Sequence, residues 1–164
     1  MTTQSRRRLT LERSFKATLD EVWELWTTKA GIESWWGPDG FTVEVRTLEL
    51  RAGGKLEYAM TATAPPQIEF MKRAGMPLTT EARLTFIEVA PPRRLSYEIQ
   101  ADFIPGVAPY PVATVVELHA DAERVKMVLT FDAMHDEQWT QRSVMGRESE
   151  LRKLEQLLGS RPKK

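Results

Sequence analysis

The sequence contains no cysteine and only two histidines among its 164 residues. Without cysteine the chain can form no disulfide bond, no thiolate zinc site and no thiol nucleophile. His119 and His135 have no further histidine at the spacing of metal ligands, and a metal site needs several convergent donors. We therefore predict no metal ion and no cofactor, and we expect both histidines to be partly exposed polar side chains.

Net charge and long apolar runs are also missing. The 23 basic and 23 acidic residues cancel, so no overall field would attract nucleic acid or an anionic membrane. No stretch approaches the roughly 18 consecutive apolar residues of a transmembrane helix, and the basic start is not followed by the apolar run of a signal peptide. The sequence therefore predicts a soluble cytoplasmic protein with neither nucleic acid nor a membrane as partner.

The chain length fits one domain. A domain of 164 residues can bury roughly two thirds of the surface that its unfolded chain exposes. No linker, repeat or low-complexity segment divides the sequence. We expect one domain over residues 1–164, with frayed tails at about 1–7 and 160–164, in a monomer or a homodimer.

The longest predicted element is a C-terminal helix over Asp136–Leu158. Asp136 is placed to cap its first turn, and Gly159 followed by Pro162 predicts its end. Apolar residues at spacings of three and four form one face, which consists of Val144, Leu151, Leu154 and Leu158. We expect the polar residues of this stretch to lie away from that face; they include Glu150, Arg152, Lys153 and Gln156.

The first quarter of the chain predicts a strand and two short helices. Arg8–Phe15 alternates between the two faces of a strand. Thr18 and Glu21 have the spacing of a capping box, which starts the first helix. The second helix begins at about Lys29 and is stopped by Gly37-Pro38.

Six further segments have the alternation or the flanking turn residues that are typical of strands. In the first of them the apolar residues switch from odd-numbered to even-numbered positions near Thr47, which predicts a β-bulge. Residues 64–80 interrupt the pattern with prolines, and we expect a loop that carries a turn or two of helix. The six predicted strands are Phe41–Leu50, Leu56–Ala62, Glu81–Val89, Arg94–Phe103, Val112–His119 and Arg124–Asp132.

This order of elements predicts an α+β fold. Short connections make consecutive strands antiparallel neighbours, which gives a seven-stranded antiparallel sheet with its helices on one side. A sheet of this size twists and curls. We expect it to curl around the C-terminal helix and to leave a space between helix and sheet.

A family resemblance extends over nearly the whole chain. It is carried, in order, by Thr18–Thr28 (TLDEVWELWTT), Glu33–Phe41 (ESWWGPDGF), Arg51–Tyr58 (RAGGKLEY), Phe86–Glu98 (FIEVAPPRRLSYE) and the glycine-containing final helix. In these segments the sequence resembles bacterial proteins similar to the C-terminal domain of the activator of the Hsp90 ATPase, within the START-like, SRPBCC or Bet v 1-like superfamily. The resemblance implies a helix-grip fold with an apolar cavity between the sheet and the C-terminal helix.

The sequence departs from that family at two places. Family members often carry tryptophan after the glycine of the final helix, where this chain has Arg147 after Gly146. The segment Pro65–Pro77 is longer than a minimal member would have, which implies an altered cavity mouth.

Inward-facing aromatic residues and methionines are candidates for the wall of the cavity. Trp23 and Trp26 are expected to serve in packing. Side chains of adjacent helical residues diverge by about 100°, so we expect only one of Trp35 and Trp36 in the core. The predicted ligand-binding residues are Trp35, Trp36, Tyr58, Met60, Tyr97, Phe103, Met127, Phe131, Trp139 and Arg147.

Arg147 interrupts the apolar face of the final helix where leucine would be expected. A buried guanidinium without a partner is too costly to persist. It must therefore pair with a carboxylate, reach solvent at the edge of the face, or face a wet cavity. In the last case Arg147 would bind the acidic end of an amphipathic ligand.

The sequence favours binding over catalysis. It has no nucleophile elbow, phosphate-binding glycine loop or dinucleotide fingerprint, and no convincing inward acid–base pair. The leading hypothesis is a cavity that holds a small apolar or amphipathic molecule. The resemblance implies two alternatives: an interaction protein that contacts an Hsp90-type chaperone, and an enzyme of the polyketide cyclase or dehydratase type.

Overall fold

One antiparallel sheet of seven strands dominates the computed structural model, which describes residues 7–101 and 106–159. The spatial order is β1-β7-β6-β5-β4-β3-β2, so every pair except β1 with β7 is also consecutive in the sequence. The predicted fold is confirmed. The strands are β1 (Arg8–Phe15), β2 (Phe41–Leu48), β3 (Lys55–Ala62), β4 (Thr79–Ala90), β5 (Arg94–Ala101), β6 (Tyr110–Asp121) and β7 (Arg124–Asp132).

Register shifts mark two bulges in the sheet. The first lies between Val45 and Thr47 in β2 and confirms the parity change seen in the sequence. The second lies between Phe86 and Glu88 in β4, where the sequence gives no such signal. Bulges increase local twist and bend a strand, so both favour a curled sheet. The tails expected at the ends of the chain lie almost wholly outside the described residues.

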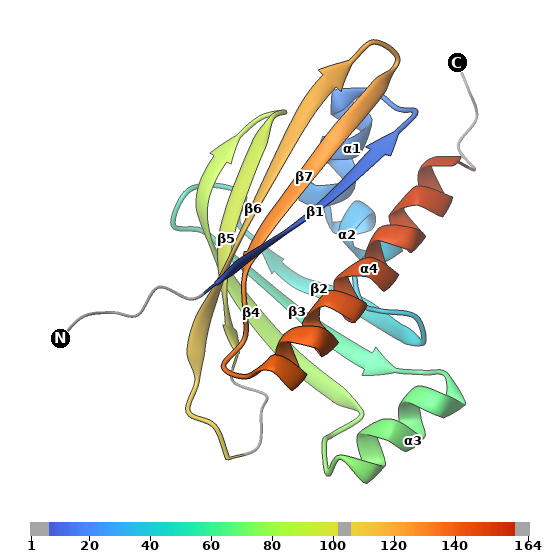
Figure 1. Cartoon of the computed structure of the whole chain (residues 1–164), viewed down its shortest axis with the longest axis vertical. Coiled ribbons are helices and arrows are strands. Elements are labelled where there is room, and N and C mark those ends of the chain that lie inside the picture. The colour runs from blue at the N-terminus through green and yellow to red at the C-terminus, as the bar shows by residue number, and fades with distance from the viewer. Residues whose placement is uncertain (1–6, 102–105, 160–164) are drawn as a thin grey trace, which may run out of the picture.

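The helices α1 (Leu19–Thr27), α2 (Lys29–Trp35), α3 (Pro65–Arg73) and α4 (Glu137–Gly159) lie on the concave side of the sheet. Figure 1 shows the sheet curving around α4, with α3 beyond the ends of β3 and β4. The helix expected as one or two turns in residues 64–80 is α3, which has nine residues. No helix in the described ranges is long and apolar enough to cross a membrane.

Two predicted caps set the starts of α1 and α4. The Thr18 hydroxyl accepts a hydrogen bond from Glu21 N at 3.1 Å, and the Glu21 carboxylate accepts one from Thr18 N at 2.9 Å. At the other helix, Asp136 Oδ1 accepts from Trp139 N at 2.8 Å. These bonds satisfy backbone donors that a helix start leaves unpaired.

The apolar face of α4 packs on the sheet as the sequence predicts. Leu151, Leu154 and Leu158 are buried, while Val144 is partly buried against the same core. Sheet residues complete this core, among them Leu84, Phe86, Val116, Leu129 and Phe131. The packing stabilises the helix more than its own propensity could.

The turn after α2 packs against a second side of α4. Gly37 N donates to Glu150 Oε2 at 2.7 Å, and Lys153 Nζ donates to the Gly37 carbonyl at 2.7 Å. Asp39 N donates to the Ser149 hydroxyl at 2.8 Å. Gly37 has φ +87°, a conformation that favours glycine. Glu150 and Lys153 thus lie away from the apolar face, on a flank of the helix that the turn covers.

Candidate functional site

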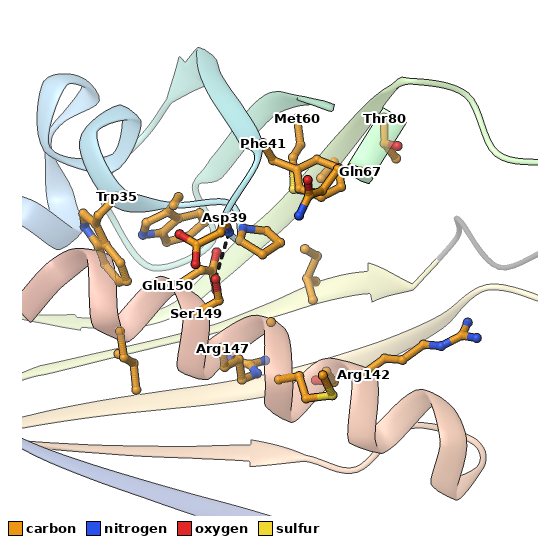
Figure 2. A pocket seen from close by; sticks show the side chains of 18 of the residues that line it. Trp35, Asp39, Phe41, Met60, Gln67, Thr80, Arg142, Arg147, Ser149 and Glu150 are labelled. Carbon is orange, nitrogen blue, oxygen red and sulfur yellow. Dashed lines mark hydrogen bonds between the residues drawn. The ribbon is translucent and has the colours of Figure 1, made fainter. Parts of the chain in front are cut away.

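A cavity of about 900 Å³ lies between α4, α3 and the concave face of the sheet. Its volume falls in the range of about 300–1,000 Å³ that is usual for small-molecule sites. Figure 2 shows Phe41, Met60 and Gln67 on the side of the cavity opposite Arg147. The wall is mostly apolar, and its charged side chains other than Asp39 lie on α4.

The inner part of the cavity is an aromatic cluster. Ring centroids lie 4.7 Å apart for Trp26 and Trp35, and 5.4 Å apart for Trp36 and Tyr58. Tyr97 lies 6.0 Å from Trp36. Such edge-to-face and tilted contacts add to the stabilisation that burial alone provides.

Trp35 and Trp36 are both buried, so the expectation that only one belongs to the core is wrong. The physical reason is that α2 ends at Trp35, whereas Trp36 has extended backbone angles of φ −68° and ψ 154°. The helical divergence of about 100° therefore does not apply across this pair. Both side chains line the cavity, and so does Trp26, which the sequence assigns only to packing.

The indole N–H groups of this cluster are not equally satisfied. Trp35 Nε1 donates to the Leu25 carbonyl at 2.7 Å, and Trp26 Nε1 donates to Met127 Sδ at 3.3 Å. Trp36 Nε1 is buried and has no hydrogen-bond partner within the described residues. A buried donor without a partner is rare and costly.

Arg147 extends from α4 towards the sheet. Its Nη2 donates to Thr114 Oγ1 at 3.0 Å, and its guanidinium carbon lies 4.2 Å from the centre of the Phe131 ring. No carboxylate in residues 7–101 and 106–159 forms an ion pair with it. The guanidinium is half-buried on the cavity wall, and its role there stays a prediction.

Two tyrosines and a glutamate lie close to Arg147. Burial raises the pKa of Tyr97, against the lowering effects of Arg147 and of hydrogen bonds from Thr114 and Arg147. Burial also raises the pKa of Tyr58, with a further contribution from Glu150. The pKa of Glu150 is itself raised by burial, which outweighs the Gly37 N–H and the positive charges of Arg147 and Lys153. Of these three groups, only the Glu150 carboxyl has a pKa shifted towards neutrality.

The mouth of the cavity lies at the α3 end and is more exposed. Phe70 on α3 is 47% exposed, and Met145 on α4 is 67% exposed. The Arg142 guanidinium carbon lies 5.7 Å from the Phe70 ring centre and 4.9 Å from that of Trp139. As the unusual length of Pro65–Pro77 implies, this segment contributes to the mouth.

Seven of the ten predicted site residues line the cavity: Trp35, Trp36, Tyr58, Met60, Tyr97, Trp139 and Arg147. Met127 and Phe131 do not, because they lie fully buried beneath Trp26 and Arg147. Phe103 lies outside the described residues. The role of each residue in binding stays a prediction.

Sequence reasoning missed Glu150, Arg142 and the α3 side chains of the wall. A signal for Glu150 was present, because it follows Arg147 by three residues and so lies on the same side of the helix. The histidines lie elsewhere: His119 is exposed at the end of β6, and His135 Nδ1 is 2.8 Å from the Tyr110 hydroxyl. No cluster of three or more potential ligands for a metal occurs in the described ranges.

A curled antiparallel sheet around a long C-terminal helix, with a cavity between them, defines the START-like helix-grip class. Within this class the chain belongs to the family described as activator of Hsp90 ATPase homolog 1-like proteins, whose model matches residues 16–159. No curated protein matches the sequence.

Solved structures of bacterial proteins share the fold. Protein CV1439 from Chromobacterium violaceum is 18% identical with a TM-score of 0.76, and the match covers 92% of this chain and 96% of that one. The AHSA1 protein from Silicibacter pomeroyi is 19% identical with a TM-score of 0.72, over 93% of this chain and 98% of that one. A protein from Arthrobacter aurescens is 20% identical with a TM-score of 0.73, over 94% and 87% respectively. At these identities the likeness shows the fold alone.

Proposed function

We propose that the protein binds a small apolar or amphipathic molecule in the cavity between the sheet and α4. The observation that supports this most directly is the cavity itself, about 900 Å³ with a mostly apolar wall and charged side chains that lie mainly on α4. This composition is typical of sites that enclose a small molecule and orient it through a few hydrogen bonds.

The cavity has a physical cost, which supports a functional role. Side chains that line an unfilled space lose the dispersion contacts that close packing would supply. Much of this wall is made of large residues that could pack against one another, such as Trp36, Met60 and Leu129. A ligand of apolar character would restore those contacts.

Native mass spectrometry of the purified protein, followed by mild organic extraction, tests the proposal. We expect a co-purifying small molecule, or stabilisation against heat by members of an apolar ligand panel. Ala82 lines the cavity, so Ala82→Phe should fill it and abolish binding. Ala113→Phe is the matched control. Ala113 is adjacent to the inward-facing Thr114 in β6, so its side chain points to the other face of the sheet and the variant should retain binding. Equal binding by Ala82→Phe and wild type would contradict this location.

A second candidate function is suggested by the family, whose description names the activator of the Hsp90 ATPase. Such a protein would contact the chaperone through its surface rather than through the cavity. Pull-down with Hsp90 and stimulation of its ATPase test this candidate. Stimulation that survives in Ala82→Phe would support it over ligand binding.

An enzymatic function is the third candidate. Glu150 is a carboxyl group on the wall of a mostly apolar cavity, and burial shifts its pKa towards neutrality, which is a setting for proton transfer. The corresponding reaction would be a polyketide cyclisation or dehydration. Turnover of a polyketide-like substrate, lost in Glu150→Gln, would support this candidate.

A further inference from the structure

Two side chains in the inner part of the cavity, Arg147 and Trp36, can only donate hydrogen bonds. The Arg147 guanidinium has five N–H donors and no acceptor. One of its nitrogens is bonded to Thr114 Oγ1 at 3.0 Å, and the guanidinium also donates to the Tyr97 hydroxyl, which leaves further N–H groups to offer. Trp36 Nε1 adds a donor that has no partner in the described part of the chain. A ligand group that fits this region should therefore be rich in acceptors.

The charges on the wall lead to the same conclusion. The charged lining residues are Asp39, Arg142, Arg147, Glu150 and Arg152. Arg152 pairs with Asp39 at 4.0 Å, and Glu150 is hydrogen bonded by Gly37 N at 2.7 Å. The positive charges of Arg147 and, to a smaller extent, Lys153 act on Glu150 as well, and Lys153 also bonds the same glycine. Arg147 is nevertheless an inner cation that forms no ion pair with a carboxylate of the described residues.

The orientation of Arg147 is fixed before any ligand arrives. Phe131 lies under its guanidinium at 4.2 Å, and Thr114, which is fully buried, holds one nitrogen. A guanidinium held in this way can offer its remaining N–H groups in a planar fork, the geometry that matches a carboxylate. Holding it in advance also reduces the entropy lost on binding.

We infer that the ligand of this cavity is an apolar monocarboxylate and that Arg147 binds its carboxylate group, an inference that rests on the proposed ligand-binding function. A single inner cation matches a single negative charge better than the nearly double charge of a phosphate monoester. The apolar part of the ligand would then lie along Trp36 and Met60, towards the mouth between α3 and α4.

Decanoate and decan-1-ol, which share a ten-carbon chain and differ in the charged group, provide the test. Binding to the full chain is followed by tryptophan fluorescence and by isothermal titration calorimetry. A charged hydrogen bond in a partly buried site should make decanoate bind about tenfold tighter or more than decan-1-ol. Arg147→Leu should remove that preference and leave decan-1-ol binding unchanged.

Two further variants separate a binding role from a structural one. Arg142→Leu makes the same substitution on the same helix at the mouth, and should keep the preference for decanoate. Arg147→Lys keeps the positive charge but loses the planar fork of N–H donors, so it should keep only part of the preference for decanoate. Circular dichroism and thermal unfolding establish that each variant is folded.

Each outcome has a definite meaning. Equal affinity of wild type for both probes, or equal weakening of both by Arg147→Leu, would overturn the carboxylate inference and leave the proposed cavity function standing. Failure of both probes to bind wild type would count against the inference and the proposed function together. Loss of the preference in Arg142→Leu but not in Arg147→Leu would move the carboxylate to the mouth and overturn the inference.

Discussion

The inner part of the cavity and its mouth are built in different ways. Trp35 and Trp36 at the inner part are buried, their rings touch, and the turn that follows them is hydrogen bonded to α4. At the mouth, Phe70 and Met145 are exposed, and a stacked arginine joins α3 to α4. The comparison teaches that the two regions differ in packing, so that under the proposed function the inner part would recognise the ligand and the mouth would admit it.

The largest effect should come from truncating the inner cluster. Trp35→Ala removes a buried ring and leaves the Leu25 carbonyl without its 2.7 Å donor. We expect a loss of about 3–5 kcal/mol in the free energy of unfolding. Urea denaturation measures it, with Phe70→Ala at the mouth as the comparison, where about 0.5 kcal/mol or less is expected. Similar losses in both variants would abolish the distinction between the two regions.

A smaller loss in the free energy of unfolding should follow when the turn after α2 loses a hydrogen bond to α4. Ser149→Ala removes the acceptor of Asp39 N, 2.8 Å away in a partly buried position. Leaving that donor unpaired should cost about 1–2 kcal/mol in the free energy of unfolding. Ser143→Ala is the matched control, since Ser143 lines the same cavity and has no side-chain hydrogen bond in the described structure. An equal effect of both substitutions would show that the attachment does not stabilise the inner region.

Glu150 should give the inner region a pH-dependent stability. Burial raises its pKa above the usual 4.5, so the folded protein holds this proton at a pH where the unfolded chain has released it. The contribution of this proton to the free energy of unfolding is therefore fully present below about pH 4.5. It is lost as the pH rises through the pKa that Glu150 has in the folded protein.

The measurement for Glu150 is urea denaturation of wild type and Glu150→Gln at several pH values from about 4 to 8. The stability of wild type relative to the variant should fall across this window. Glu155→Gln, an exposed position on the same helix, is the control and should show a smaller change. A relative stability that rises with pH would mean that the carboxylate is favoured by folding, contrary to the expected sign.

The fold was largely predictable because local signals agree with one another. Alternation in the strands, the parity change near Thr47 and the capping box at Thr18 each describe a short segment, and each is confirmed. Even Arg147 could be singled out, since one charge in an apolar face is visible in the sequence alone. These features depend on residues that are near one another in the chain.

The missed features depend on contacts between distant segments. The spacing of Glu150 from Arg147 indicates its side of α4, but its partner, the N–H of Gly37, comes from a turn more than a hundred residues earlier. Trp36 joins Trp35 in the core because the helix ends between them. The α3 side chains belong to the mouth because β3 and β4 carry the helix there. No periodicity in one segment reports which other segment covers it.

The smallest expected effect concerns access at the mouth. Phe70→Ala removes an exposed ring that lines the opening and contacts Arg142. Because the inner contacts are unchanged, the affinity for decanoate should change by no more than about twofold. The association and dissociation rate constants should rise together, as measured by stopped-flow tryptophan fluorescence, since a smaller side chain obstructs entry and exit alike. A change in the preference for decanoate over decan-1-ol would instead mean that the mouth takes part in recognition, and the separation of the two regions would fail.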